Sequence, residues 1–202
     1  MRTELAFVGD IHGNLGALRG IWDALVERGV PHVVFLGDYI NKGAFSARVL
    51  DDLISHSAAG RATLLAGNHE AALLDALDRE DLSAFLKMGG AMTIRAYVGG
   101  RVAADVLGEF TSKLPYQHVE ALRRMPLVYE TEDLIAQHSS VGASTRKFRI
   151  SAHVPVGDLP RVGSRSAQLD TGCGADSGRL TALLWPTLDY VQVDHHGDVV
   201  AG

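Results

Sequence analysis

The chain has 202 residues, of which 47% are hydrophobic and 21% are charged, and its formal net charge is −5. These values fit one globular domain over residues 1–202 and exclude a general nucleic-acid-binding surface, because no long basic run is present. The one cysteine, Cys173, excludes an internal disulfide and suits a reducing compartment. Residues 1–9 are too short and too charged for a signal peptide or membrane span, so we expect a cytoplasmic protein.

The first third of the chain alternates predicted strands and helices. Short apolar runs at residues 4–10, 32–38 and 62–70 each end in polar residues, which is typical of buried strands that open into loops. Residues 15–29 and 46–55 have apolar side chains at helical spacing. This alternation favours a mostly parallel sheet with right-handed crossovers.

The rest of the chain shows a different sequence pattern. Residues 71–125 lack strand-like runs and predict helices, with a break at the stretch MGGAMT, residues 88–93. After Pro126 the short segments LVYE, DLIAQHSS, FRISAHVP, AQLDTG, RLTALLW and YVQVDHHGDVV predict strands separated by turns. We therefore expect an α/β part followed by a β-rich part.

The three early strands end in side chains that bind metals or transfer protons. The stretches are GDIHG (residues 9–13), GDYINKG (37–43) and GNHE (67–70). Each alone also fits an ordinary turn, but ligands gather outside the carboxyl ends of parallel strands, so three such exits in order favour one site. We expect this site to contain Asp10, His12, Asp38, Asn68 and His69.

Two later histidines end apolar runs in the same way. His138 closes DLIAQH, and His153 closes FRISAH. Carboxylate, amide and imidazole ligands without a thiolate suit divalent manganese, iron or zinc. Six such ligands are too many for one catalytic ion with an open position, and they fit two ions that share a carboxylate. The predicted metal ligands are Asp10, His12, Asp38, Asn68, His138 and His153.

The other five histidines serve as a comparison. His32, His56 and His118 lie at helix or strand edges, and we interpret them as surface or capping residues without partners. His195 and His196 are adjacent in a predicted hairpin turn. Because neighbouring residues on a strand point to opposite faces, we exclude this pair from the site.

The ordered motifs resemble those of the calcineurin-like metallophosphoesterase superfamily. The nearest branch holds the phosphoprotein phosphatases, lambda phage phosphatase and the symmetrical diadenosine tetraphosphatases. GDIHG, GDYINKG and GNHE match its first three motifs, and QHSSVG and SAHVP are similar to its two later histidine motifs. Residues 88–97 and 169–185 also look like that branch. The resemblance implies an α/β fold in which a metallophosphatase-type β-sandwich of mixed sheets is flanked by helices. The active site would lie at the carboxyl ends of strands, beside a helical, cap-like segment at about residues 71–125.

The resemblance also implies roles for single residues. It assigns Asp10 and His12 to a first metal, Asp38 to both metals, and Asn68, His138 and His153 to the second. His69 would be the general acid that protonates the leaving oxygen, with Asn41 beside it. Lys42 and Asn68 would position the phosphate. Arg146 and Arg149 are further phosphate-binding candidates, although both also fit solvated loop charges.

Asn41 and Lys42 replace the Asp-Arg pair of the protein phosphatases. We expect the Asn41 carbonyl to accept the ring N–H of His69 without adding negative charge, so that the pKa of His69 is lower than beside a carboxylate. A serine alkoxide needs full protonation as it departs, whereas the leaving group of a phosphoanhydride is weakly basic and needs little. Asn-Lys-Gly is a reasonable turn, and it is also similar to the motif of enzymes related to the diadenosine tetraphosphatases.

The predicted function is that of a dinuclear metal-dependent phosphoesterase, a hydrolase in which a metal-bound hydroxide attacks phosphorus directly. Nucleoside or dinucleoside polyphosphates are the favoured substrates, with two divalent ions as cofactors, Mn²⁺ before Fe or Zn. Two alternatives stay open: a serine/threonine or tyrosine protein phosphatase, and a non-catalytic metal-binding module. The expected partner is a phosphorylated small molecule, a nucleotide or a phosphoprotein, without membrane or general nucleic-acid binding.

Overall fold

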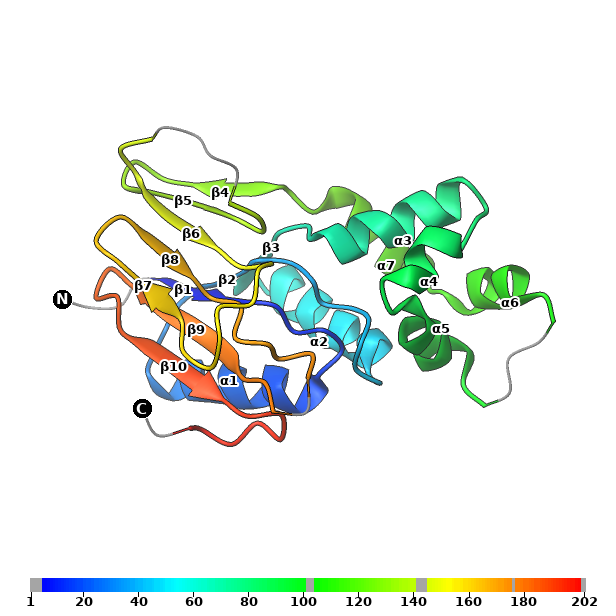
Figure 1. Ribbon diagram of the computed structural model, residues 1–202, viewed down its shortest axis with the longest axis horizontal. Coiled ribbons are helices and arrows are strands. Elements are labelled where there is room, and N and C mark those ends of the chain that lie inside the picture. The colour runs from blue at the N-terminus through cyan, green and yellow to red at the C-terminus, as the bar shows by residue number, and fades with distance from the viewer. Residues whose placement is uncertain (1–4, 101–103, 141–144, 176, 201–202) are drawn as a thin grey trace.

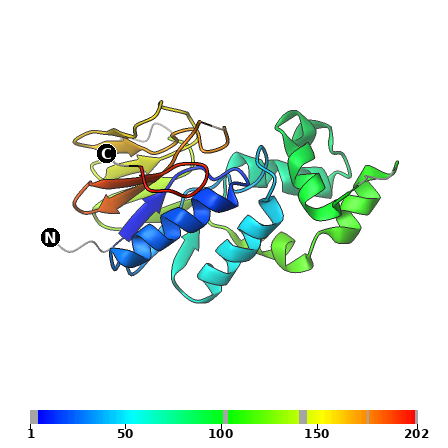
Figure 2. The same cartoon turned by 90° about the horizontal axis from the view of Figure 1, so that it is seen from below.

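The computed structural model describes residues 5–100, 104–140, 145–175 and 177–200. Two five-stranded sheets pack face to face (Figure 1). Helices α1 (Leu15–Glu27) and α2 (Ser46–Ala58) cover the outer face of the first sheet, opposite the second sheet (Figure 2). This arrangement confirms the predicted sandwich flanked by helices.

The first sheet has the strand order β10-β9-β1-β2-β3. Its strands are β1 (Leu5–Val8), β2 (Val33–Phe35), β3 (Ala62–Leu64), β9 (Leu180–Trp185) and β10 (Tyr190–Val193). β1, β2 and β3 are parallel, as predicted, and α1 and α2 provide the crossovers that parallel pairing requires. β9 and β10 pair in the antiparallel sense.

The second sheet has the order β4-β5-β6-β8-β7. Its strands are β4 (Val128–Glu130), β5 (Leu134–Gln137), β6 (Phe148–Ser151), β7 (Arg161–Val162) and β8 (Ser166–Gln168). β5, β6 and β8 are parallel, and the edge strands β4 and β7 are antiparallel. The sequence did not predict β7, because two residues carry no alternation to detect.

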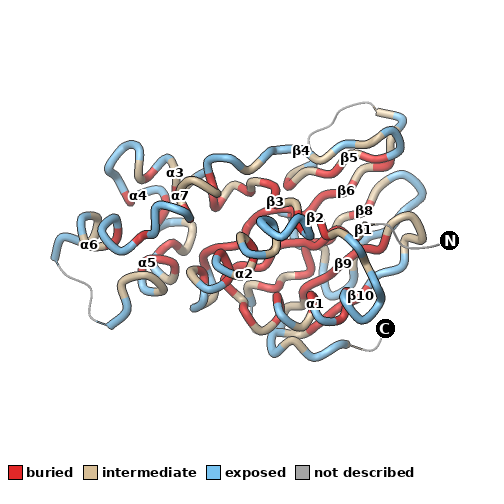
Figure 3. Tube along the Cα trace, turned by 180° about the vertical axis from the view of Figure 1, so that it is seen from behind, coloured by how far each residue is buried: buried red, intermediate tan, exposed pale blue. Residues whose placement is uncertain are grey.

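The first sheet is buried on both faces, which explains its continuous apolar runs. Phe7 and Val34 point toward the second sheet and share a cluster with Ile150. The alternating residues Val8 and Phe35 point the other way and pack with α1 and α2. Figure 3 shows the buried trace, in red, concentrated in these strands and in the loops that follow them.

The predicted helical segment forms a group at one end of the sandwich (Figure 1). Its helices are α3 (Asn68–Asp78), α4 (Ser83–Lys87), α5 (Gly90–Val98), α6 (Val106–Lys113) and α7 (Tyr116–Arg124). The break falls at Met88 and Gly89, inside the predicted stretch. Buried residues of these helices, such as Leu73 and Phe110, belong to the same core cluster as α1 and α2. None of the helices in the described ranges is both long and apolar enough to span a bilayer.

Three histidines that we interpreted as residues without partners do have partners. These are Asp51 for the buried His118 at 2.9 Å, Trp22 for His56 with ring centroids 3.5 Å apart, and Thr63 for His32 at 2.9 Å. The expectation that they have no partners was wrong because the partners lie far away in the sequence. For His118 the contact exists because α7 packs against α2.

Candidate active site

Asp38 lies at the centre of the predicted ligand set. Its Oδ2 is 3.9 Å from Nε2 of His12, 3.7 Å from Nε2 of His69 and 3.3 Å from Nε2 of His138. Two groups of potential ligand atoms, each within 4.8 Å of one another, meet at this carboxylate. The groups are His12, Asp38 and His69, and Asp38, His138 and His153. The two groups therefore share Asp38.

Asp10 and Asn68 complete the cluster. Asp10 Oδ2 is 3.6 Å from His12 Nε2, and its Oδ1 accepts the backbone N–H of His153 at 3.3 Å. Asn68 Oδ1 is 2.8 Å from His138 Nε2, which is in turn 3.1 Å from His153 Nδ1. The structure thus brings the six predicted metal ligands to one place, which we call the ligand cluster.

The ligand cluster has the chemistry of a site for divalent cations. Burial raises the pKa of the Asp10 carboxyl well above its usual value, and the nearby carboxylates of Asp38 and Asp170 raise it further. For Asp38, burial also acts to raise the pKa, but the hydrogen bond and charge of His138, together with the charges of His69 and His12, outweigh it and the pKa is lowered. Bound cations would relieve the repulsion between carboxylates that are buried so close together, and imidazole and amide donors complete a suitable set of ligands.

Backbone conformation marks the same residues. Five non-glycine residues of this region have a φ in the left-handed region: His12 (49°), Asp38 (55°), Asn41 (72°), Lys42 (56°) and His153 (70°). Among the described residues, two further non-glycine residues share it. Such conformations cost about 1–3 kcal/mol each and concentrate at functional sites, where the surrounding structure holds them.

Glu70 holds the loops together, although the sequence analysis gave it no role. It is fully buried, and its carboxylate accepts the backbone N–H groups of Gly67, Asp38 and Tyr39 at 3.0, 2.8 and 2.8 Å. Burial raises the pKa of Glu70 to about 7, and the charge of Asp38 adds to the shift. Glu70 lies three residues after the N-cap Gly67 of α3 and accepts its backbone N–H, which is the half of a capping box that a glutamate supplies; a glutamate at this position is the signal that could have identified it.

The side chain of Asn41 lies between His69 and Thr93. The hydroxyl of Thr93 donates to Asn41 Oδ1 at 2.7 Å, and Asn41 Nδ2 is 2.6 Å from His69 Nδ1. An amide nitrogen is only a donor, so Nδ1 is the acceptor and the neutral ring carries its proton on Nε2. The expectation that the Asn41 carbonyl faces the ring was wrong, because the fully buried Thr93 of α5 occupies that carbonyl.

The electrostatic surroundings of the two rings near Lys42 are similar. Burial lowers the pKa of His69; Asp38 opposes this shift and Lys42 adds to it. Burial also lowers the pKa of His12 to about 4, again with a contribution from Lys42. Lys42 is an exposed residue, and its Nζ lies 2.7 Å from His12 Nε2. Lys42 therefore presents a positive charge at the edge of the ligand cluster.

The two candidate arginines lie elsewhere. Arg149 lies between Phe148 and Ile150 on β6, and both of these neighbours point into the core, so Arg149 points to the opposite face. It lines a small hollow with Ser140 and Thr145 that contains no member of the ligand cluster. Arg146 is exposed just before β6. The structure therefore lends neither arginine support as a phosphate ligand, because strand alternation turns Arg149 away.

The family model for calcineurin-like phosphoesterases matches residues 3–196. The chain belongs to the calcineurin-like phosphoesterase family. This membership confirms the resemblance seen in the motifs.

One relative matches this chain over most of its length. A zinc-dependent endopolyphosphatase of Saccharomyces cerevisiae is 30% identical over 143 residues, which are 70% of this chain and 42% of that protein. The chain thus spans less than half of that relative's length.

Two solved structures share the fold. One, a protein assigned as a diadenosine tetraphosphatase, has a TM-score of 0.70 at 18% identity, covering 96% of this chain and 94% of that one. The other, a cold-active protein-tyrosine phosphatase of a psychrophilic Shewanella species, has a TM-score of 0.59 at 13% identity, covering 99% and 80%. These likenesses confirm the fold class.

Proposed function

We propose that this phosphoesterase hydrolyses phosphoanhydride bonds of nucleoside or dinucleoside polyphosphates with two divalent metal ions, Mn²⁺ being preferred. The shared position of Asp38 between two groups of ligand atoms supports a pair of ions. Asp10, His12 and Asp38 would hold one ion, and Asp38, Asn68, His138 and His153 the other. When bound, divalent ions neutralise phosphoryl oxygens and lower the pKa of coordinated water.

The protein's own groups then orient the substrate. The Lys42 ammonium lies at the edge of the ligand cluster, where it can bind a phosphate oxygen as a point charge. The Asn68 amide lies beside His138, so its Nδ2 group can donate to a second phosphate oxygen while Oδ1 faces the ring. His69 directs Nε2 toward Asp38, at 3.7 Å, and presents its ring proton inside the cluster.

The observation that carries the substrate class is the contact between Asn41 and His69. Because the amide N–H of Asn41 points at Nδ1, a second ring proton has no acceptor there, and the cationic ring is disfavoured. His69 then acts through a neutral Nε2–H group, which is a weak proton donor. Such a donor suffices for the weakly basic leaving group of an anhydride and serves poorly for a serine alkoxide.

A panel of substrates tests this function. The protein loaded with Mn²⁺ would be assayed on diadenosine tetraphosphate, inorganic tripolyphosphate, a phosphoserine peptide and p-nitrophenyl phosphate. We expect the largest kcat/KM on the anhydrides. A largest value on the phosphopeptide would favour the protein phosphatase alternative. If the metal-bound protein hydrolyses none of the four substrates, the result would favour a non-catalytic module. The cytoplasmic location stays a prediction from the sequence.

A further inference from the structure

A hollow of about 210 Å³ adjoins the ligand cluster. Its lining begins at His12 and Lys42 and continues over Phe45, Cys173 and His195. Pockets for whole ligands usually have about 300–1,000 Å³, so this hollow has room for one part of a ligand whose remainder lies in the cluster. We call it the Phe45 hollow.

The walls of the Phe45 hollow suit a flat aromatic group. Phe45 stands at the N-cap of α2 with 49% of its surface exposed, and His195 is exposed in the turn after β10. Aromatic and imidazole rings stack on nucleobases, and this stacking tolerates any base because every base has a π-face. Both rings line the same hollow.

The Phe45 hollow carries little positive charge with which to bind an inorganic polyphosphate chain. Among the lining residues that the structure describes, Lys42 is the one permanently charged side chain. Its Nζ lies 2.7 Å from His12 Nε2, at the cluster end of the hollow. A ligand with its negative charge at Lys42 and a neutral ring over Phe45 matches this layout, whereas an extended polyphosphate would leave most of its charge without a counter-ion.

The chain holds both walls in place. The backbone N–H of Phe45 donates to Gly13 O at 3.1 Å, which fixes the start of α2 to the loop after β1. On the other side, the turn that carries His195 packs closely on α1: a Cβ on Gly16 would lie 3.0 Å from His195 O. Of the two adjacent histidines that we excluded from the site as a pair, His195 lines the hollow and His196 does not.

We propose that the Phe45 hollow binds the nucleoside part of the substrate. The base packs against Phe45 and His195, and the phosphates run past Lys42 into the ligand cluster. This inference rests on the proposed function and deepens it, since it favours nucleotides over inorganic polyphosphate.

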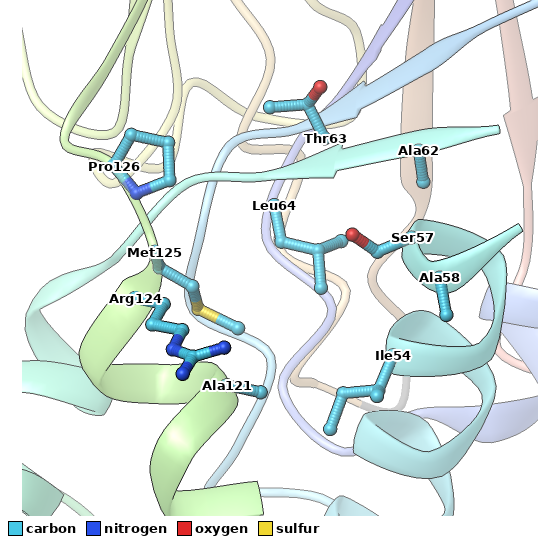
Figure 4. Close-up of a pocket in the computed structure, with 10 residues that line it drawn as sticks. All are labelled: Ile54, Ser57, Ala58, Ala62, Thr63, Leu64, Ala121, Arg124, Met125 and Pro126. Atoms are coloured by element: carbon cyan, nitrogen blue, oxygen red, sulfur yellow. The ribbon is translucent and has the colours of Figure 1, made fainter. Parts of the chain in front are cut away.

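A larger hollow does not compete for this role. It has a volume of about 370 Å³ and lies between α2, β3 and α7 (Figure 4). Its lining is mostly apolar, with residues such as Ile54, Leu64 and Met125, and it contains no member of the ligand cluster. It therefore does not adjoin the place where a phosphate would react.

Calorimetric titration with a matched pair of ligands tests the inference. The Mn²⁺-loaded protein would be titrated with α,β-methylene-ADP and with methylenediphosphonate, which has the same phosphonate groups and no nucleoside. We expect Phe45→Ala to raise the Kd of the nucleotide about 10-fold, the loss expected for one stacking ring, and to change the Kd of methylenediphosphonate less than about 2-fold. His195→Ala should act in the same sense with a smaller effect.

Tyr116→Ala is the control, because Tyr116 is a 75% exposed aromatic residue on α7. It should change neither Kd. Equal weakening of both ligands by Phe45→Ala, or an unchanged Kd for the nucleotide, would overturn the inference. The substrate panel is independent of this result: a protein that binds nucleotide through Phe45 and hydrolyses no anhydride would keep the nucleoside site and lose the proposed function.

Discussion

The ligand cluster draws on two regions that are built differently. The loops after β1 and β2 are buried and bound to each other, since the backbone carbonyl of Asp38 accepts the N–H groups of Ile11 and His12 at 3.0 and 2.9 Å. The second sheet contributes His138, which is buried, and His153, which is exposed. The difference indicates that the first sheet sets the shape of the cluster, whereas the second sheet closes it with ligands that depend more on a cation.

The largest effect is expected at the residue that joins the two regions. Asp38→Asn keeps the shape of the side chain and an acceptor for the backbone N–H of His69, but it removes the charge shared by both groups of ligands. We expect kcat/KM on diadenosine tetraphosphate to fall at least about 10³-fold, or about 4 kcal/mol. Metal content of the purified variant should fall with it. A variant that keeps its metal content and its activity would refute the shared carboxylate.

A pair of histidine variants tests directly whether the two regions differ. His153→Ala should weaken metal binding by at least the roughly 10–100-fold typical of changes around metal ligands, while the chelated protein keeps its stability. His12→Ala should weaken metal binding similarly and also destabilise the chelated protein, because His12 is buried and lies 3.2 Å from the carbonyl oxygen of Ile40. Metal titrations and denaturant unfolding after chelation would measure both. Equal stability losses would show that the two regions are equally rigid.

The next largest effect is expected at Glu70, which holds the loops of the first region together. Glu70→Gln replaces one acceptor oxygen with a donor that faces backbone N–H groups, so we expect a loss of about 2 kcal/mol in the free energy of unfolding. Glu120→Gln is a matched control on α7, where Glu120 pairs with Arg124 at the surface, and it should cost less than about 0.5 kcal/mol. Urea unfolding of the metal-free proteins would compare them. A loss of the same size in both variants would mean that Glu70 does not brace the loops.

The smallest effect is expected at Asn41, the residue of the first region that contacts the proposed general acid His69. Asn41→Asp gives His69 Nδ1 a negatively charged acceptor, so we expect activity on phosphoserine to rise about 10-fold relative to activity on diadenosine tetraphosphate, or about 1.4 kcal/mol. Thr93→Val should shift the ratio in the same direction because it releases the Asn41 carbonyl, and Thr93→Ser should not. An unchanged ratio of the two kcat/KM values would remove the argument from Asn41 to anhydrides.

Much of this structure could be predicted from local pattern. The strand exits and the helical segment follow from periodicity, and Asp10, Asp38 and His153 were found because each follows an apolar run. The orientation of the Asn41 amide could not be predicted, since it depends on Thr93, which is 52 residues away. The described lining residues of the Phe45 hollow likewise come from four separate segments of the chain. The periodicity of each segment does not indicate that these segments lie together in the fold.

The left-handed backbone of the ligand cluster has a consequence for attempts to improve this protein. Glycine would relax the chain at the exposed His153, recovering part of the roughly 1–3 kcal/mol that its left-handed conformation costs. Directed evolution that rewards heat resistance alone would thus accept a replacement that deletes a ligand. Engineered heat resistance and turnover would pull in opposite directions at this position, so any thermostable variant should be sought in α6 or at the exposed strand β7 instead.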